Sequence, residues 1–189
     1  MTIMRIRPYE PRDRDGVRFA CLNSEGPCTM TPAEQHFILT TYCDYYIERE
    51  PENCFVAANE ADEAVGYVIC AENYDIFWQV FRKEYLPRIS ESEKHFRQSA
   101  SLSTVLQDKY KEFYPAHLHI DLLPEYQRQG VGSKLVDALA SHLRDKGVPG
   151  VMLTVGSSNY VGQGFYNKYG FNLLEKTSGD VAYGLKLTE

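Results

Sequence analysis

The sequence has no long apolar run. None of its stretches approaches the roughly 20 apolar residues that a helix needs to cross a bilayer, and Met1 to Pro8 lack the hydrophobic core of a secretory signal. Its five cysteines include no C-x-x-C pair, and no metal-binding pattern is predicted. We therefore expect a cytoplasmic protein with reduced thiols, no membrane partner and no metal.

The sequence is also short of positive charge. The formal net charge is −6 and the pI is about 5.4, which argues against a nucleic-acid partner. An acidic protein that binds a polyanion needs a local positive site. No internal repeat is visible, and the 189 residues predict one globular domain over 1–189.

What the chain does have is a strand that runs into a glycine loop between His119 and Ser133. Gly130 and Gly132 lack the Cβ atoms that would keep an anion away from the backbone. The first N–H groups of the following helix have no intrahelical partner. Arg128 adds a charged fork suited to phosphate oxygens. The stretch is therefore predicted to cradle an anion.

Two motifs in this half of the chain together resemble a known family. Gln127-Arg128-Gln129-Gly130-Val131-Gly132 is similar to the Q/R-x-x-G-x-G/A pyrophosphate loop of the GNAT N-acetyltransferases, and Asn159 followed by Phe165-Tyr166-Asn167-Lys168-Tyr169-Gly170-Phe171 resembles that family's second element. The resemblance covers residues 116–175. It implies acetyl-CoA as the cofactor, and N-acetyl transfer by direct attack of an acceptor amine in a ternary complex.

The resemblance also implies the fold, an α/β domain with a twisted, mostly antiparallel mixed sheet and helices on both faces. Pattern and propensity place its elements independently. Strands are expected at 4–7, 54–58, 64–71, 116–123, 150–155, 171–175 and 181–187, and helices at 12–23, 31–48 and 133–146. The strand at 150–155 should be parallel to the one at 116–123.

Cofactor contacts are implied for residues of the loop, the central strand and the last helix. These are Leu122, Leu123, Gln127, Arg128, Gln129, Gly130, Val131, Gly132, Ser133, Asn159, Phe165 and Tyr166. The two leucines would contribute backbone groups at a splayed strand end, next to Pro124, which cannot donate a ladder hydrogen bond. A purely capping role for Asn159 is an equally good interpretation.

The catalytic candidates are Tyr166, Asp121 and His119. The resemblance implies that Tyr166 lies beside the thioester sulfur as a hydrogen-bond donor; the alternative is that it only packs. Asp121 and His119 share a face of the central strand with His117, and we rank both above His117 as the base. Ala116 to His119 also resembles arylalkylamine N-acetyltransferases, in which two histidines relay the amine proton, although a structural role for either histidine is as well supported.

Residues 72–115 are rich in aromatic residues and longer than the family's usual connection. As an insertion they would lie over the acceptor side of the cleft. A satellite core or a homodimer contact is an equal alternative.

Two other functions compete with the enzyme. The stretch 117–132 also resembles the acetyltransferase-like domain of O-GlcNAc hydrolases, which implies a free-standing relative of that domain. Some such domains are thought not to bind the cofactor, so a catalytically silent binding module is the alternative function. A plain nucleotide binder is disfavoured because no P-loop lysine follows the glycines.

Overall fold

The protein is built on one seven-stranded sheet. The computed structural model describes residues 4–26, 29–90 and 93–188. The strands are β1 (Arg5–Pro8), β2 (Phe55–Ala58), β3 (Ala64–Ala71), β4 (Ala116–Leu122), β5 (Gly150–Gly156), β6 (Asn172–Lys176) and β7 (Asp180–Lys186). They lie in the order β1-β2-β3-β4-β5-β7-β6, and every pair except β4–β5 is antiparallel. The mixed sheet and the parallel central pair confirm the predictions.

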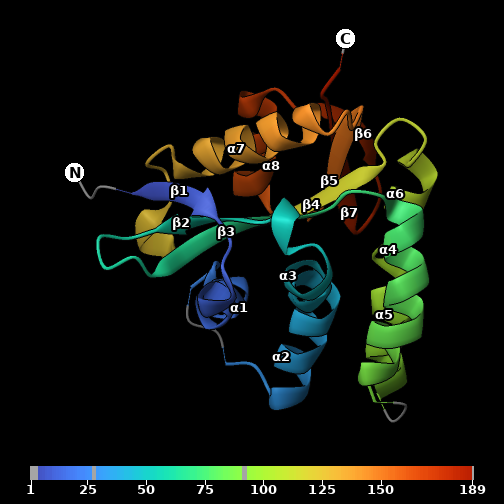
Figure 1. Ribbon diagram of the computed structural model, residues 1–189. Coiled ribbons are helices and arrows are strands. Elements are labelled where there is room, and N and C mark those ends of the chain that lie inside the picture. The colour runs from blue at the N-terminus through green and yellow to red at the C-terminus, as the bar shows by residue number, and fades with distance from the viewer. Residues whose placement is uncertain (1–3, 27–28, 91–92, 189) are drawn as a thin grey trace.

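Helices cover both faces of this sheet, as predicted (Figure 1). They are α1 (Arg14–Asn23), α2 (Pro32–Leu39), α3 (Tyr45–Arg49), α4 (Tyr74–Val80), α5 (Lys94–Leu102), α6 (Val105–Tyr110), α7 (Val131–Asp145) and α8 (Tyr160–Tyr169). The long α7 and α8 lie above the sheet in the view of Figure 1, whereas α1, α2 and α3 lie below it and α4 to α6 flank them. None of the helices within the described ranges is long and apolar enough to cross a membrane.

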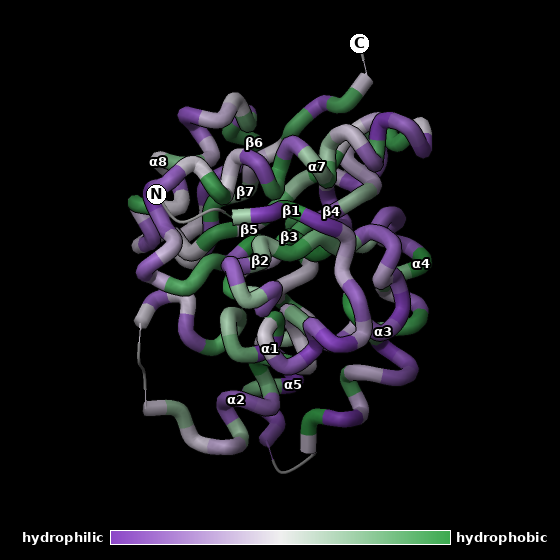
Figure 2. Tube along the Cα trace, turned by 60° about the vertical axis from the view of Figure 1, so that its left-hand side comes forward, coloured by the Kyte–Doolittle hydropathy of each residue, from purple (hydrophilic) through white to green (hydrophobic). Residues whose placement is uncertain are grey.

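Strand β4 has two chemically different faces. Leu118, Ile120 and Leu122 pack in the cluster under α7, while His117 and His119 turn toward α3. Side chains of a strand alternate between faces, and the predicted division of this strand is confirmed. Figure 2 shows the apolar strands enclosed by more polar helices.

Helix α7 begins directly after the glycine loop. Its N-cap is Gly130, with a left-handed φ of 77° that favours glycine, and Gly147, with a φ of 76°, follows its end. The buried stripe consists of Val131, Leu135, Val136, Leu139, Ala140 and Leu143. Helical spacing in the sequence predicts Val131, Leu135, Ala138, Leu139 and Leu143 for this stripe, and of these Ala138 is only half-buried.

The predicted helix at 31–48 is interrupted in its middle. Thr31 and Glu34 form a capping box at its start. A π-helical turn at Thr40–Asp44 then separates α2 from α3. Such a turn inserts an extra residue and rotates the helix beyond it, so that Tyr45 and Tyr46 are both buried.

The paired segment that joins β4 and β5 is very short. Only Ala116 pairs with Val151 and His117 with Met152, whereas β3 and β4 pair from Gly66 to Ala71. Residues 118–122 therefore have a ladder partner on the β3 side alone. This unpaired length of β4 positions the candidate site.

Candidate active site

A cavity of about 470 Å³ lies where the pairing of β4 and β5 stops. Strands β4, β5 and β7, the π-helical turn, α5 and α8 with its N-cap line it. Its walls are Tyr42, Ser99, Leu102, Ser103, Leu118, His119, Ile120, Asp121, Leu153, Thr154, Val155, Gly156, Asn159, Tyr166 and Asp180. All three predicted catalytic residues are among them. Ser99, Leu102 and Ser103 come from the aromatic-rich segment 72–115.

The charge in this wall is acidic. Asp121 and Asp180 line the cavity, and no lysine or arginine does so among the described residues. A positively charged ligand group would therefore be attracted to the cavity.

Asp121 is half-buried on the lower face of β4. Its Oδ2 accepts a hydrogen bond from the Tyr67 hydroxyl at 2.5 Å, and Tyr67 is its direct neighbour on β3. Burial raises the pKa of Asp121 to about 6, partly offset by the hydrogen bond from Tyr67. A carboxylate with such a pKa is suited to hold or accept protons near neutral pH.

His119 and His117 share one hydrogen-bonding partner. The Tyr46 hydroxyl lies 3.0 Å from Nε2 of each imidazole. Burial lowers the pKa of His119 to about 4 and that of His117 to about 3, with the neighbouring His119 adding to the latter shift. Both rings are therefore neutral at pH 7, and the lower face of β4 holds two uncharged imidazoles beside a carboxylate.

Tyr166 enters the cavity from α8. Its ring is buried and packs against Phe171 and Tyr183, at centroid distances of 5.6 and 5.7 Å. Burial, and the nearby charge of Asp121, raise the pKa of the phenol. The hydroxyl thus keeps its proton at neutral pH, as a hydrogen-bond donor must.

The glycine loop is held in place by its own glutamine. The Gln127 side-chain amide donates to the Leu122 carbonyl at 2.8 Å and to the Ser24 carbonyl at 2.7 Å. Gln129 donates from its amide to the Glu125 carbonyl at 2.7 Å. These bonds give both glutamines a structural role in shaping the loop.

The loop has the form expected of an anion cradle. Arg128 has a φ of 59° and Gly130 of 77°, a local shape that turns successive backbone amides toward one side. A Cβ at Gly130 would meet no atom within 4 Å, so the space there is open. Within the described ranges no side chain caps α7, which leaves the N–H groups of Val131, Gly132 and Ser133 for a ligand. The diphosphate of a coenzyme A fits these residues.

The two leucines at the end of β4 differ in their backbone bonds. Leu123 donates to the Val65 carbonyl and accepts from the Tyr126 N–H, so both of its backbone groups are used inside the protein. Strand neighbours alternate in direction, so the Leu122 N–H points away from β3, toward the unpaired side. Leu122 is the better placed of the two for a ligand.

The remaining predicted contacts lie on and before α8. Asn159 caps this helix by accepting from the Gly162 N–H at 2.8 Å, and it also lines the cavity. The Phe165 ring lies against Gly132, where an added Cβ would be 3.3 Å away. Gly132 therefore permits the close approach of α7 to α8.

Several residues of the site region were not singled out from the sequence as functional, among them Tyr46, Tyr67, Ser99 and Ser103. Tyr46 and Tyr67 hold the predicted bases, and Ser99 and Ser103 form part of the wall. Strand pairing alone gives a signal for Tyr67, because a correct β3–β4 register sets it opposite Asp121. Tyr46 depends on the π-helical turn, for which the sequence carries no recognisable signal.

Comparison with known proteins agrees with this fold. The crystal structure of SsHAT superposes with a TM-score of 0.87 at 27% identity, covering 98% of this chain and 99% of that one. PaiA N-acetyltransferase from Thermoplasma acidophilum in complex with coenzyme A gives 0.60 at 16% identity (97% and 99% covered). The ribosomal-protein-S18-alanine N-acetyltransferase from Escherichia coli gives 0.57 at 17% (99% and 96%). The sequence model of the Acetyltransferase (GNAT) family matches residues 20–171, and the chain belongs to this family of acetyltransferases.

Proposed function

We propose that the protein transfers an acetyl group from acetyl-CoA to a cationic amine by direct attack, with both substrates bound together. The observation that carries this proposal is the meeting of Asp121, His119 and Tyr166 in one cavity at the unpaired edge of β4. None of the four described free cysteines lines this cavity.

The proposed cofactor contacts come from the loop and the ends of its neighbours. Acetyl-CoA, when bound, supplies a thioester carbonyl that an amine can attack. The amides of Val131, Gly132 and Ser133, with the Arg128 side chain, would hold the diphosphate. The Leu122 N–H and Asn159 are proposed to bind the pantetheine arm, and Gln127, Gln129, Gly130 and Phe165 to shape its surroundings. Leu123 is proposed to contact the cofactor through its side chain alone, because both of its backbone groups are hydrogen-bonded within the protein.

The three catalytic candidates are proposed to have separate tasks. Asp121 attracts and orients the ammonium form of the acceptor. His119 is neutral and offers a nitrogen lone pair for the proton that the amine must lose. Tyr166 holds its proton firmly and donates a hydrogen bond where negative charge develops on the leaving group.

An acceptor screen tests the transfer itself. Thiol release from acetyl-CoA would be followed with monoamines, putrescine, glucosamine and short peptides that carry a free amino terminus or a lysine. We expect cationic amines to react and amides to be inert. An acidic acceptor that reacts faster than every amine would contradict the proposal.

The alternative function is a silent binding module, in line with the predicted resemblance to O-GlcNAc hydrolase domains. Titration calorimetry with acetyl-CoA separates the two. Saturable binding supports the enzyme. No heat at millimolar cofactor, from protein whose folding is verified by circular dichroism, would favour the module.

The cytoplasm is the proposed location. Cys21, Cys43, Cys54 and Cys70 are free thiols, as expected in a reducing compartment; Cys28 lies outside the described residues. Whether the protein forms a homodimer stays a prediction to be tested by light scattering.

A further inference from the structure

The register of the sheet shows which residues face each other across the gap between β4 and β5. His117 pairs with Met152 in the last parallel pair before the strands diverge. Four residues further along each strand, Asp121 on β4 is at the level of Gly156 on β5. Gly156 pairs in turn with Asp180 on β7. Asp121 and Asp180 are therefore at one level of the sheet, on opposite sides of the gap.

The two carboxylates also belong to the same face of the sheet. Asp121 shares the lower face of β4 with His119, because side chains two residues apart in a strand point the same way. On β7, Val181 and Tyr183 pack on the upper face, in the cluster under α7. Asp180 precedes Val181, so alternation places it on the lower face. Both carboxylates line the 470 Å³ cavity.

Strand spacing gives the separation of the two carboxylates. Neighbouring strands lie about 4.8 Å apart, so two spacings put Asp121 and Asp180 about 10 Å apart, and the divergence of the strands adds to this. An ammonium that is hydrogen-bonded to a carboxylate lies about 3 Å from it. Roughly 5–9 Å then remain between two ammonium nitrogens that each bind one carboxylate. A chain of about three to six methylene groups has this length, at roughly 1.3 Å for each bond of an extended chain.

The Asp180 carboxylate is available to a ligand. The turn before β7 uses only the backbone of this residue: its carbonyl accepts from the Thr177 N–H at 2.8 Å, and its N–H donates to the Thr177 hydroxyl at 2.9 Å. The carboxylate itself has no hydrogen bond or ion pair with any residue that the structure describes. Asp180 is also exposed, so a cation can reach it without breaking a contact within the protein.

Tyr42 forms the wall between the two ends of this space. Its ring lies edge-to-face with that of His119, with 5.5 Å between the centroids. Burial raises the pKa of the Tyr42 phenol, a hydrogen bond with Ser103 opposes this shift, and the charge of Asp180 adds to it. The phenol is therefore within electrostatic reach of Asp180. An aromatic ring and hydroxyl oxygens are favourable neighbours for an ammonium group and a methylene chain.

We propose that the acceptor is an α,ω-diamine of about three to six carbons, with its reacting amine at Asp121 and its second ammonium at Asp180. This inference rests on the proposed acetyl transfer and selects one substrate class among the amines of the screen. Asp180 is then a specificity-determining residue, because it binds the far end of the acceptor and not the reacting atoms.

The reaction changes only one end of the diamine. Its nitrogen bonds to the acetyl carbon while the carbon–sulfur bond breaks, the nitrogen loses one proton, and coenzyme A leaves as the thiol. The product carries one ammonium instead of two. If it bound again in the reverse direction, an uncharged amide would face Asp180. We therefore expect mass spectrometry to show the monoacetylated diamine accumulating before any diacetylated product. Formation of both products at equal rates would contradict the proposal.

Kinetics with matched acceptors test the second contact. Diamines of two to eight carbons would be compared with n-alkyl monoamines of the same length. We expect kcat/KM to be at least about tenfold higher for the diamine than for its monoamine near the preferred length. The advantage should fall for the shortest and the longest diamines, which cannot reach both carboxylates. Equal kcat/KM values for diamines and monoamines would overturn the proposal.

Three variants assign this advantage to one carboxylate. Asp180→Asn should reduce the ratio of kcat/KM between diamine and monoamine to about one. Asp180→Glu should keep the advantage but shift it toward shorter diamines, because its carboxylate reaches one methylene group further into the cavity. Asp145→Asn is the matched control, since it removes an equal charge from an exposed residue outside the cavity, and its ratio should not change. A ratio that stays high in Asp180→Asn would overturn the proposal.

Titration calorimetry separates this inference from the proposed function, because it needs no turnover. We expect putrescine to bind the full-length protein at least about tenfold more tightly than butylamine, and Asp180→Asn to remove this difference. A protein that binds putrescine in this way but acetylates no amine refutes the proposed function and leaves the two-carboxylate site in place. A protein that acetylates amines but does not distinguish diamines from monoamines refutes the site alone.

Discussion

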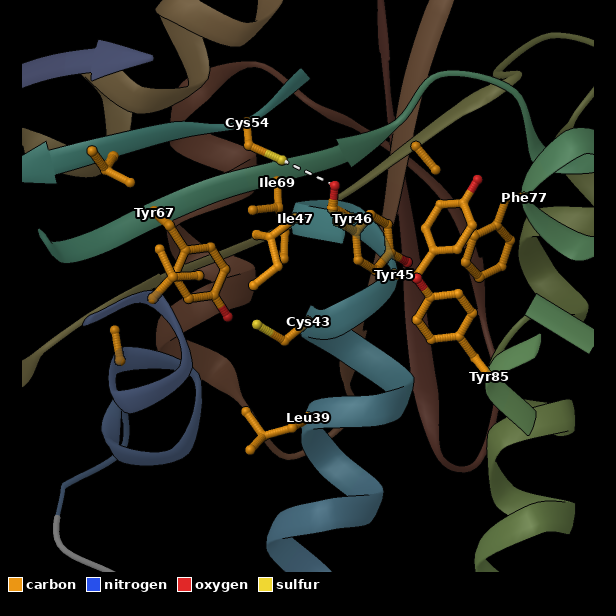
Figure 3. Packing of buried hydrophobic residues seen from close by; sticks show 14 of the residues in the cluster. Leu39, Cys43, Tyr45, Tyr46, Ile47, Cys54, Tyr67, Ile69, Phe77 and Tyr85 are labelled. Atoms are coloured by element: carbon orange, nitrogen blue, oxygen red, sulfur yellow. Dashed lines mark hydrogen bonds between the residues drawn. The ribbon is translucent and has the colours of Figure 1, made fainter. Parts of the chain in front are cut away.

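The two faces of the sheet are packed with different chemistry. Under α7 the cluster is mainly aliphatic, and its buried tyrosines among the described residues are Tyr166 and Tyr183. The opposite cluster contains buried tyrosines from α3, β3, α4 and the π-helical turn Phe81–Tyr85 that follows α4: Tyr45, Tyr46, Tyr67, Tyr74 and Tyr85. Figure 3 shows the packing of Tyr45, Tyr46, Tyr67 and Tyr85. Aliphatic packing fixes geometry without polar partners. Phenols add hydroxyls that must be satisfied, and those of Tyr46 and Tyr67 are satisfied by His117, His119 and Asp121 of the site.

This difference predicts different roles for the two faces of the sheet. The α7 face carries the glycine loop, whereas hydroxyls of the tyrosine face bond to His117, His119 and Asp121. Apart from Tyr166, which reaches the cavity from this side, substitutions on the α7 face should therefore change cofactor binding or stability. Substitutions of hydroxyls on the other face should change turnover.

The largest effect is expected at the glycine loop. Gly130→Glu places bulk and negative charge in the cradle, and we expect acetyl-CoA affinity to fall by about a thousandfold, measured by calorimetry. Gly147→Glu is the matched control, since that glycine has nearly the same φ (76° against 77°) at the other end of α7. Tight binding by Gly130→Glu would remove the loop from the site.

Next in size is a pure packing change on the same face. Leu139→Ala should lower the free energy of unfolding by about 2–5 kcal/mol, because Leu139 is fully buried against the sheet. The remaining folded protein should keep its kcat and KM. Urea denaturation measures the loss. A fall in kcat at full folding would show that the two faces are not separate in function.

On the tyrosine face, Asp121→Asn should lower kcat/KM for the amine by about a hundredfold while acetyl-CoA affinity stays unchanged. Asp180→Asn is the comparison, because that carboxylate lines the same cavity from an exposed position. We expect its effect to be several times smaller. Equal losses would mean that the two carboxylates act only through their charge.

The pH dependence tests the same group. Asp121 must be ionised to hold the ammonium, and its pKa is raised to about 6. We therefore expect kcat/KM to rise about tenfold from pH 5 to a plateau near pH 7.

The same carboxyl group should make the stability depend on pH. Because the pKa of Asp121 is raised in the folded state, its stabilising contribution is fully present below the unfolded pKa of 3.8 and is lost as pH rises through about 6. Asp121→Asn should remove that part of the stability profile in urea titrations.

The smallest effect is expected for Tyr166→Phe. It keeps the buried ring and removes the donor, so kcat should fall by about tenfold or less with acetyl-CoA affinity unchanged. Tyr183→Phe is the control, since its ring packs on Tyr166 and its hydroxyl accepts from Asn167 instead. An unchanged kcat, with chemistry shown to be limiting, would reduce Tyr166 to packing.

Much of the α7 face could be predicted from the sequence. The glycine loop, the α7 stripe and the alternation of β4 depend on local patterns, and each is present apart from the shift of Ala138. The tyrosine face was harder to predict from the sequence, because it depends on a π-helical turn and on contacts between segments far apart in the chain. Tyr46 meets His117 across 71 residues, a distance over which periodicity carries no information.

The short joint between β4 and β5 has a mechanical consequence. Strands β1 to β4 form one part of the sheet and strands β5 to β7 form the other. Two residue pairs between β4 and β5 connect the two parts. An elongated cofactor bound between the unpaired edges of β4 and β5 would bond to both strands and connect them for as long as it is bound. Binding would then reduce the flexibility between the two parts of the sheet. This flexibility would return after each turnover, when the product leaves.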